Sequence, residues 1–132
     1  MALTALGFLL QRLREARSDS LRDVAKLAEI DHAYYYRLET GDKESPSDEV
    51  LSKLIKALKA KEREAEMLRY VAKHPATDLA LVEYVLNNNT VTSEEFSSAA
   101  GAVFRGNARP EPAQLIERVR RMLAMENDHG NG

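Results

Sequence analysis

The chain has 132 residues, of which 44% are hydrophobic and 30% are charged, and its formal net charge is −2. This length suits one domain, or a small domain with an appendage of similar size, and the apolar fraction is ample for a packed core. The sequence contains no cysteine, which excludes disulfides and thiol chemistry and fits a reducing cytosol. No apolar run approaches the roughly 20 residues that cross a bilayer. We expect a globular, cytoplasmic protein with no membrane partner.

The first predicted element is a helix over residues 3–17. In this segment Leu6, Leu10 and Leu13 are spaced to form one buried stripe. The first ten residues are apolar, but they carry no basic leader and no plausible cleavage site. We therefore expect a helix here and not an export signal.

Residues 20–41 predict two short helices joined by a tight corner. Ser20 and Asp31 have side chains that can cap the two helices. The apolar positions that we expect to face inward, at the corner or on the two helices, are Val24, Ala25, Ala28, Ile30, Tyr35 and Leu38. At about 100° per residue, the side of the second helix opposite Tyr35 and Leu38 stays exposed. A helix with one anchored face and one projecting face suits the major groove of DNA.

The projecting face of the second helix carries the candidate DNA contacts. Arg37 can pair with a guanine edge or reach a phosphate, unless it is an exposed arginine linked to a nearby Glu or Asp. Ala33 can meet a thymine methyl, and His32 either touches a base or only extends the helix cap. The hydroxyls of Tyr34 and Tyr36 suit phosphates.

Charge provides only a local argument for DNA binding. The first 75 residues carry 14 Lys or Arg against 13 Asp or Glu, so overall charge does not favour a nucleic acid. The affinity depends on the phosphates that are neutralised. A patch of Arg22, Lys26, Arg37 and Lys43 would neutralise such phosphates. The Ser20 hydroxyl or Arg22 can also bind the DNA backbone.

The helical pattern continues beyond the two-helix motif. Ser47 can cap a helix whose inward positions are Val50, Leu51, Leu54, Ile55 and Leu58. Residues 59–64 are rich in helix formers and opposite charges, so we expect a helical connection that runs on to Lys73. His74 and Pro75 then interrupt the helix, because proline lacks the backbone donor and restricts the residue before it.

The second half of the chain predicts further short helices. Thr77 or Asp78 can cap the first, and residues 92–95 form a capping box for the next. Gly106, Pro110 and Pro112 precede a last helix. The apolar positions of the three helices are Leu79, Val82, Val85 and Leu86, then Phe96, Ala99, Ala100, Val103 and Phe104, and then Leu115, Ile116, Val119, Met122 and Leu123. We divide the chain into a helix-turn-helix domain (1–60), a helical connection (61–74), a helical C-terminal region (75–126) and a frayed tail (127–132).

The motifs of the first half resemble the XRE family, the helix-turn-helix repressors related to phage lambda repressor and Cro. The order and spacing agree over some fifty residues. The matching residues are Leu13-Arg14-Glu15-Ala16-Arg17, Ser20-Leu21-Arg22-Asp23-Val24-Ala25, Ile30, Tyr35-Tyr36-Arg37-Leu38-Glu39-Thr40-Gly41, Pro46-Ser47, Leu51, Lys53, Leu54, Ala57 and Leu58. Leu21 departs from the pattern, because the family usually places a glutamine there, near a phosphate.

The resemblance implies an all-α fold: a lambda-repressor-like helix-turn-helix bundle followed by a small helical C-terminal region. It implies an ion pair between Arg14 and Glu39 that sets the angle of the second motif helix. It also implies double-stranded DNA as the partner and a homodimeric repressor that reads an inverted repeat, with the C-terminal region as the dimerisation or regulatory part. The alternative is that this region only enlarges a monomeric core.

An enzyme is not expected. The three histidines, His32, His74 and His129, are far apart, and neither a metal-ligand spacing nor a phosphate loop is present, so we expect no metal and no cofactor. A different function would keep the fold and act through a protein partner. The size and layout resemble DdrO-like and ImmR-like repressors, so an antitoxin with its toxin, or a repressor removed by a metallopeptidase, stays open. The segment from Arg105 to Pro112 is the candidate cleavage or docking site.

Overall fold

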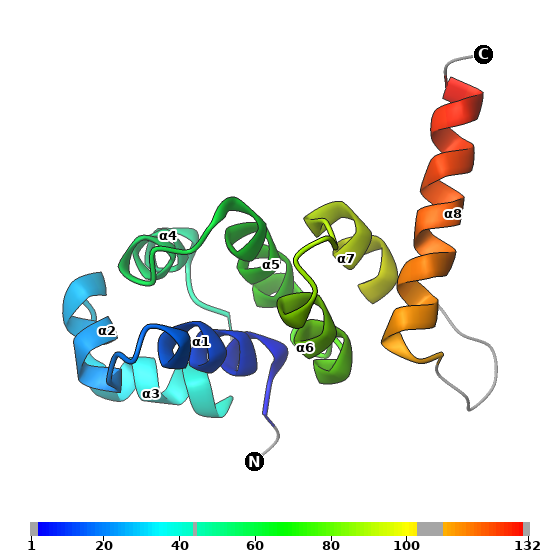
Figure 1. Cartoon of the computed structure of the whole chain (residues 1–132). Coiled ribbons are helices and arrows are strands. Elements are labelled where there is room, and N and C mark those ends of the chain that lie inside the picture. The colour runs from blue at the N-terminus through cyan, green and yellow to red at the C-terminus, as the bar shows by residue number, and fades with distance from the viewer. Residues whose placement is uncertain (1–2, 44, 103–109, 131–132) are drawn as a thin grey trace. The chain divides into compact units, whose positions relative to one another are not determined.

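A computed structural model of the chain describes residues 3–43, 45–102 and 110–130, with side chains up to residue 127. All regular secondary structure in these ranges is α-helical, and the chain divides into two compact units, Met1–Leu79 and Ala80–Gly132 (Figure 1). Within the described ranges, none of the helices combines the length and apolar character needed to span a bilayer. The all-α fold class expected from the sequence is confirmed.

The first unit contains five helices that enclose one core. They are α1 (Ala5–Ala16), α2 (Leu21–Ala28), α3 (His32–Thr40), α4 (Asp48–Ala57) and α5 (Glu62–Lys73). Helix α1 packs against α3 and α5, α2 packs against α3 and α4, and α4 packs against α5. The largest fully buried side chains of the unit are Tyr35, Leu9, Leu10, Leu38, Leu54, Met67, Leu68, Val24 and Val71. The pair α2–α3 is thus held between α1 and α4.

The starts of these helices are determined locally. The side chain of Ser20 accepts the backbone N–H of Asp23, and the Asp23 carboxylate accepts the backbone N–H of Ser20 in return. At the starts of α3 and α4, the side chains of Asp31 and Ser47 each accept the backbone N–H of the third residue after them. All three predicted caps are confirmed. Such caps form because each one satisfies a backbone donor that the first helical turn leaves without a partner.

The prediction of a helical connection over residues 59–64 is wrong for its first three residues. Helix α4 ends at Ala57, and Lys59 adopts a φ of 50°. The backbone N–H of Ala60 donates to the carbonyl of Ile55 at 3.1 Å. This bond closes the C-terminal end of α4, with Lys59 in the left-handed region of backbone conformation. The chain therefore turns before α5 begins at Glu62, because packing of α5 on α1 and α4 overrides the helix propensity of residues 59–61.

The predicted inward positions are buried to different degrees. Val24, Ala25, Ala28, Leu51, Leu54 and Leu58 are buried, whereas Leu13, Ile30, Val50 and Ile55 are partly exposed. Leu9, which the predicted stripe of the first helix omitted, is fully buried. Helix α1 contacts both α3 and α5, so its buried face is wider than a single stripe.

The second unit contains α7 (Ser93–Ala100), α8 (Pro112–Gly130) and nearly all of α6 (Leu79–Asn87). Helix α7 packs against α8, and Phe96, Ala99, Leu115, Ile116 and Val119 are buried. The capping box between Thr92 and Glu95 is formed as predicted. Leu81 of α6 is buried, whereas Leu79 and Leu86 are only partly so.

The last helix extends into the tail of the sequence. Helix α8 runs from Pro112 to Gly130 and so includes the first four residues of the tail at 127–132. No proline or glycine interrupts residues 113–129, so nothing local ends the helix earlier. Met122 is half-exposed rather than inward. Val103, Phe104, Gly106 and most of the segment from Arg105 to Pro112 lie outside the described residues.

Candidate nucleic-acid interface

Helix α3 has one buried side and one exposed side. Tyr35 and Leu38 are both 0% exposed, while His32, Ala33 and Arg37 are exposed and Tyr36 is 51% exposed. The buried pair anchors the helix in the core, and the helical period places the exposed residues on the other side. The structure therefore brings four of the predicted contacts onto one projecting helix face. A fifth, Tyr34, is only partly exposed.

The contacts around this face show what each side chain is free to do. Asp31 accepts the backbone N–H of Tyr34 at 3.1 Å, so capping of α3 does not need His32. Arg37 donates from Nε to the carbonyl of Ala33 at 3.3 Å, and no carboxylate among the described residues forms an ion pair with it. This long bond at an exposed position is weak. The guanidinium can leave it to contact DNA.

The predicted cations around the motif are all exposed. Arg22 and Lys26 lie one turn apart on α2 and share a face. Lys43 comes three residues after the end of α3, and its backbone N–H donates to the carbonyl of Arg37 at 3.2 Å. The backbone of Lys43 therefore lies at the C-terminal end of α3. A phosphate backbone that passes this end of the helix meets a cation there.

The surface also carries negative charge. The backbone and side-chain hydrogen bonds from Ser20 hold the pKa of Asp23 below its usual value, so this exposed carboxylate stays ionised. Asp31 and Asp42 are exposed as well. These charges would repel a phosphate, so binding of a nucleic acid here would depend on local geometry more than on total charge.

Two further side chains of the motif, Ser20 before α2 and Leu27 on it, are exposed. The Ser20 hydroxyl oxygen accepts the Asp23 N–H at 3.0 Å, and its own hydrogen can still be donated to a phosphate. Leu27 is 57% exposed, and it is not among the contacts predicted from the sequence. The exposure of Leu27 was predictable from the sequence, because the spacing of Val24, Ala25 and Ala28 places it outside the inward face.

An ion pair connects α1 to the end of α3. Arg14 Nε donates to Glu39 Oε2 at 2.7 Å, and Arg14 Nη2 donates to Glu39 Oε1 at 3.0 Å. A third donor, Arg14 Nη1, reaches the carbonyl of Asp19 at 3.1 Å. The bond to Glu39 raises the pKa of Arg14 although burial acts against it. Two parallel bonds fix direction as well as distance, so this pair restrains α3 relative to α1.

The hydroxyl of Tyr35 is buried beside this pair. No group in the described part of the chain lies in hydrogen-bond geometry with this hydroxyl. Burial, and secondarily the nearby Glu39, raise the pKa of Tyr35 far above its usual value. The ring therefore stays neutral at every ordinary pH, and its role is to anchor α3 through apolar contact.

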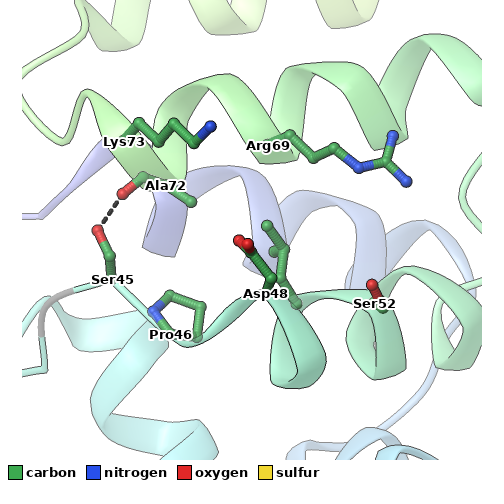
Figure 2. A pocket seen from close by; sticks show the side chains of 8 residues that line it. Ser45, Pro46, Asp48, Ser52, Arg69, Ala72 and Lys73 are labelled. Atoms are coloured by element: carbon green, nitrogen blue, oxygen red, sulfur yellow. Dashed lines mark hydrogen bonds between the residues drawn. The ribbon is translucent and has the colours of Figure 1, made fainter.

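A polar pocket of about 250 Å³ lies between the start of α4 and α5 (Figure 2). The Ser45 hydroxyl donates to the carbonyl of Ala72 there, which ties the segment before α4 to α5. Its other lining residues are Pro46, Asp48, Leu51, Ser52, Arg69 and Lys73. The cations belong to α5 and the carboxylate to α4, so the pocket has no single charge preference. Arg69 also pairs with Glu66 at 2.7 Å.

One comparison with known proteins concerns this region. Residues 5–68 match the family model described as a helix-turn-helix domain. The match spans α1 to α4 and the first half of α5, and thus includes every residue of the exposed α3 face. No curated protein matches the chain. The first unit therefore contains a helix-turn-helix domain, the kind of domain that DNA-binding regulators use.

Proposed function

We propose that this protein is a sequence-specific DNA-binding transcriptional regulator of the XRE type. The observation that carries the proposal is the exposed face of α3, held on its other side by the fully buried Tyr35 and Leu38. In a helix-turn-helix domain the second helix enters the major groove with its N-terminal residues toward the bases. His32 and Ala33 occupy that end of α3.

The side chains of the face have different roles. Arg37 presents two donors to a guanine edge, and Ala33 packs on a thymine methyl. Tyr34, Tyr36 and Lys43 contact phosphates, as do Ser20 and Arg22 at the start of α2. Base contacts select the sequence, and phosphate contacts set position and most of the salt dependence.

We further propose that the protein acts as a homodimeric repressor on an inverted repeat. One reading helix covers only a few base pairs, and a two-fold dimer doubles the site while matching the symmetry of the DNA. Helix α8 supports a symmetric partner, because Met122 and Met125 are 47% and 61% exposed on it. Of the possible occupants, a second copy, a toxin or a peptidase, we favour a second copy, because the proposed inverted-repeat site needs two reading helices.

Genomic footprinting with the full-length wild type and an Arg37→Ala variant tests the proposal. We expect the wild type to select a defined site. Arg37→Ala should weaken binding to that site by about 1 to 3 kcal/mol and relax the preference at one base position, whereas Lys43→Ala should weaken binding to all sequences similarly and reduce the salt slope by about one.

Arg69→Ala is the matched control. Arg69 is an exposed arginine on α5, a helix that packs against α1 and α4, so the substitution removes the same charge outside the two motif helices and outside the proposed dimer face of α8. We expect little change in base preference. If the wild type selects no sequence, the proposed function is wrong. If Arg37→Ala weakens binding equally on every DNA, Arg37 positions the protein and does not read a base.

A further inference from the structure

Gly7 in α1 marks an unusually close approach between α1 and the end of α3. A Cβ atom at position 7 would lie 2.3 Å from the carbonyl oxygen of Glu39 and 2.8 Å from that of Leu38. Both are backbone atoms of α3, so no side-chain rotation relieves the clash. Real Cβ atoms do not come this close to a neighbour, so one of the two helices would have to move.

Helix α1 thus meets the end of α3 at two places. Gly7 allows the backbones to touch, and two helical turns further along, Arg14 holds the Glu39 side chain through two hydrogen bonds of 2.7 and 3.0 Å. The two contacts act differently. The ion pair restrains the direction of Glu39, whereas the missing side chain at position 7 determines how near the α3 backbone lies to α1.

We propose that Gly7 is a positioning residue for DNA recognition. It sets the depth at which α3 is seated in the domain and hence the position of Ala33 and Arg37 relative to the bases. This inference rests on the proposed function. On helix propensity alone, alanine at position 7 would favour α1. The close approach to α3 predicts the opposite: alanine at position 7 should disturb the packing of α1 on α3.

The expected displacement is large enough to matter for base contacts. For the 2.3 Å separation to reach ordinary contact at 3.4 Å, α1 and α3 must separate by about 1 Å. Hydrogen bonds to base edges tolerate only a few tenths of an ångström. Long, exposed cations such as Arg22, Lys26 and Lys43 can adjust to a phosphate. A displaced α3 should therefore lose specific binding and retain most non-specific binding.

The test compares Gly7→Ala with Val71→Ala in the full-length protein. Val71 is fully buried in α5, a helix that packs against α1 and α4. Its truncation lowers stability through a cavity without pressing on the α3 backbone. Affinity for the site that the wild type selects, and for an unrelated duplex, is measured where both variants are folded. We expect Gly7→Ala to lower the ratio of the two affinities about tenfold, the size of one lost bidentate base contact. Val71→Ala should leave it within about twofold of wild type.

A second measurement does not involve DNA. Backbone residual dipolar couplings and a crystal structure of Gly7→Ala report where α3 lies relative to α1. We expect a displacement of about 1 Å, or a matching reorientation, in Gly7→Ala. Val71→Ala should show none. An unmoved α3 overturns the inference even if the wild type binds no specific DNA, so the two failures are distinguishable. A displaced α3 with an unchanged affinity ratio also overturns it.

If Gly7→Ala does not fold, the same comparison is made in a Lys59→Gly background. Lys59 has a φ of 50°, where glycine is favoured, and it lies between α4 and α5, outside the two motif helices. Failure to fold in that background also overturns the inference, because the close approach is then a requirement for folding and not a device for positioning α3.

Discussion

At the scale of single residues, several helix ends of the first unit adopt a left-handed conformation. Gly41 ends α3 with a φ of 88°, and Ser18, Glu29 and Lys59 take φ values of 58°, 58° and 50° without being glycine. Glu29 closes α2 at the corner of the helix-turn-helix motif, where the Ile30 N–H donates to the Ala25 carbonyl at 3.0 Å. The left-handed region costs an L-residue roughly 1–2 kcal/mol. The hydrogen bonds and the packing of α2 on α3 offset this cost.

Glu29→Gly should therefore stabilise the first unit. Glycine removes the strain of the left-handed region but adds freedom to the unfolded chain, so the expected net gain is about 0.5–1 kcal/mol. Urea unfolding followed by circular dichroism measures it. Gly41→Ala is the control, because it introduces the same strain at the end of α3 and should destabilise by about 1 kcal/mol. A less stable Glu29→Gly variant would contradict this expectation.

At the scale of elements, Glu95 links the start of α7 to α8. Its carboxylate accepts the backbone N–H of Thr92 at 3.0 Å and the Nε–H of Arg120 at 3.0 Å, and Arg120 also reaches the carbonyl of Thr90 at 3.3 Å. Helix α7 has only eight residues, too few to be stable alone. Its cap and its packing on α8 therefore depend on the same charged group.

The stability of α7 and α8 should fall in acid. Burial raises the pKa of Glu95, but the Thr92 N–H and the Arg120 guanidinium outweigh it, so the pKa lies below its usual value of 4.5. Because the folded-state pKa is the lower one, the contribution of Glu95 is complete above about pH 4.5 and is lost as the pH falls through the folded-state pKa. NMR signals of Phe96 and Val119 during acid titration measure this loss.

Glu95→Gln is the comparison for that titration. The amide keeps the shape of the side chain, can still accept the Thr92 N–H, and does not titrate. We expect the variant to be less stable than wild type at neutral pH and to show a weaker acid dependence of the Phe96 and Val119 signals. An unchanged acid profile in Glu95→Gln would show that other carboxylates cause the transition.

At the scale of the whole molecule, the two units have different roles in the proposed function. We propose that the first unit presents α3 to DNA and that the second unit brings two copies together through α8. From Arg121 to Asn127 the side chains of α8 are mostly exposed, and Met122 and Met125 are the large apolar ones among those exposed. A helix that exposes methionines next to arginines and glutamates can pair with its own copy. The pairing buries the methionine side chains and leaves the charged side chains at the solvent-exposed edge of the interface.

Substitution of Met122 and Met125 by glutamate should weaken the dimer. Each buried methionine is worth about 1.5–3 kcal/mol, so we expect the dissociation constant to rise at least about tenfold. Sedimentation equilibrium measures it. Ala124→Glu is the matched control, because Ala124 is exposed on the same helix but lies opposite Met122. A wild type that is monomeric at all concentrations would end this part of the proposal, and equal weakening by Ala124→Glu would point to charge and not to the methionine face.

Local features of the fold were predictable because their causes lie within a few residues. The caps at Ser20, Asp31, Ser47 and Thr92 each depend on a side chain and a backbone group three positions away. The interruption at His74 and Pro75 follows from the geometry of proline. The exposed face of α3 follows from helical spacing once Tyr35 and Leu38 are taken as core. The break at Lys59 was not predictable, because there the docking of α5 opposes the local propensity of charged helix formers.

The sequence by itself determined where most helices begin and which side of α3 faces solvent, since hydrogen bonds across one turn and a 3.6-residue period are short-range causes. Only the tertiary structure decided how close α1 comes to α3 at Gly7, where Ser45 attaches to α5, and which residues of α8 stay exposed. These depend on atoms tens of residues apart. Their separation is set by the packing of whole helices, which no local pattern encodes.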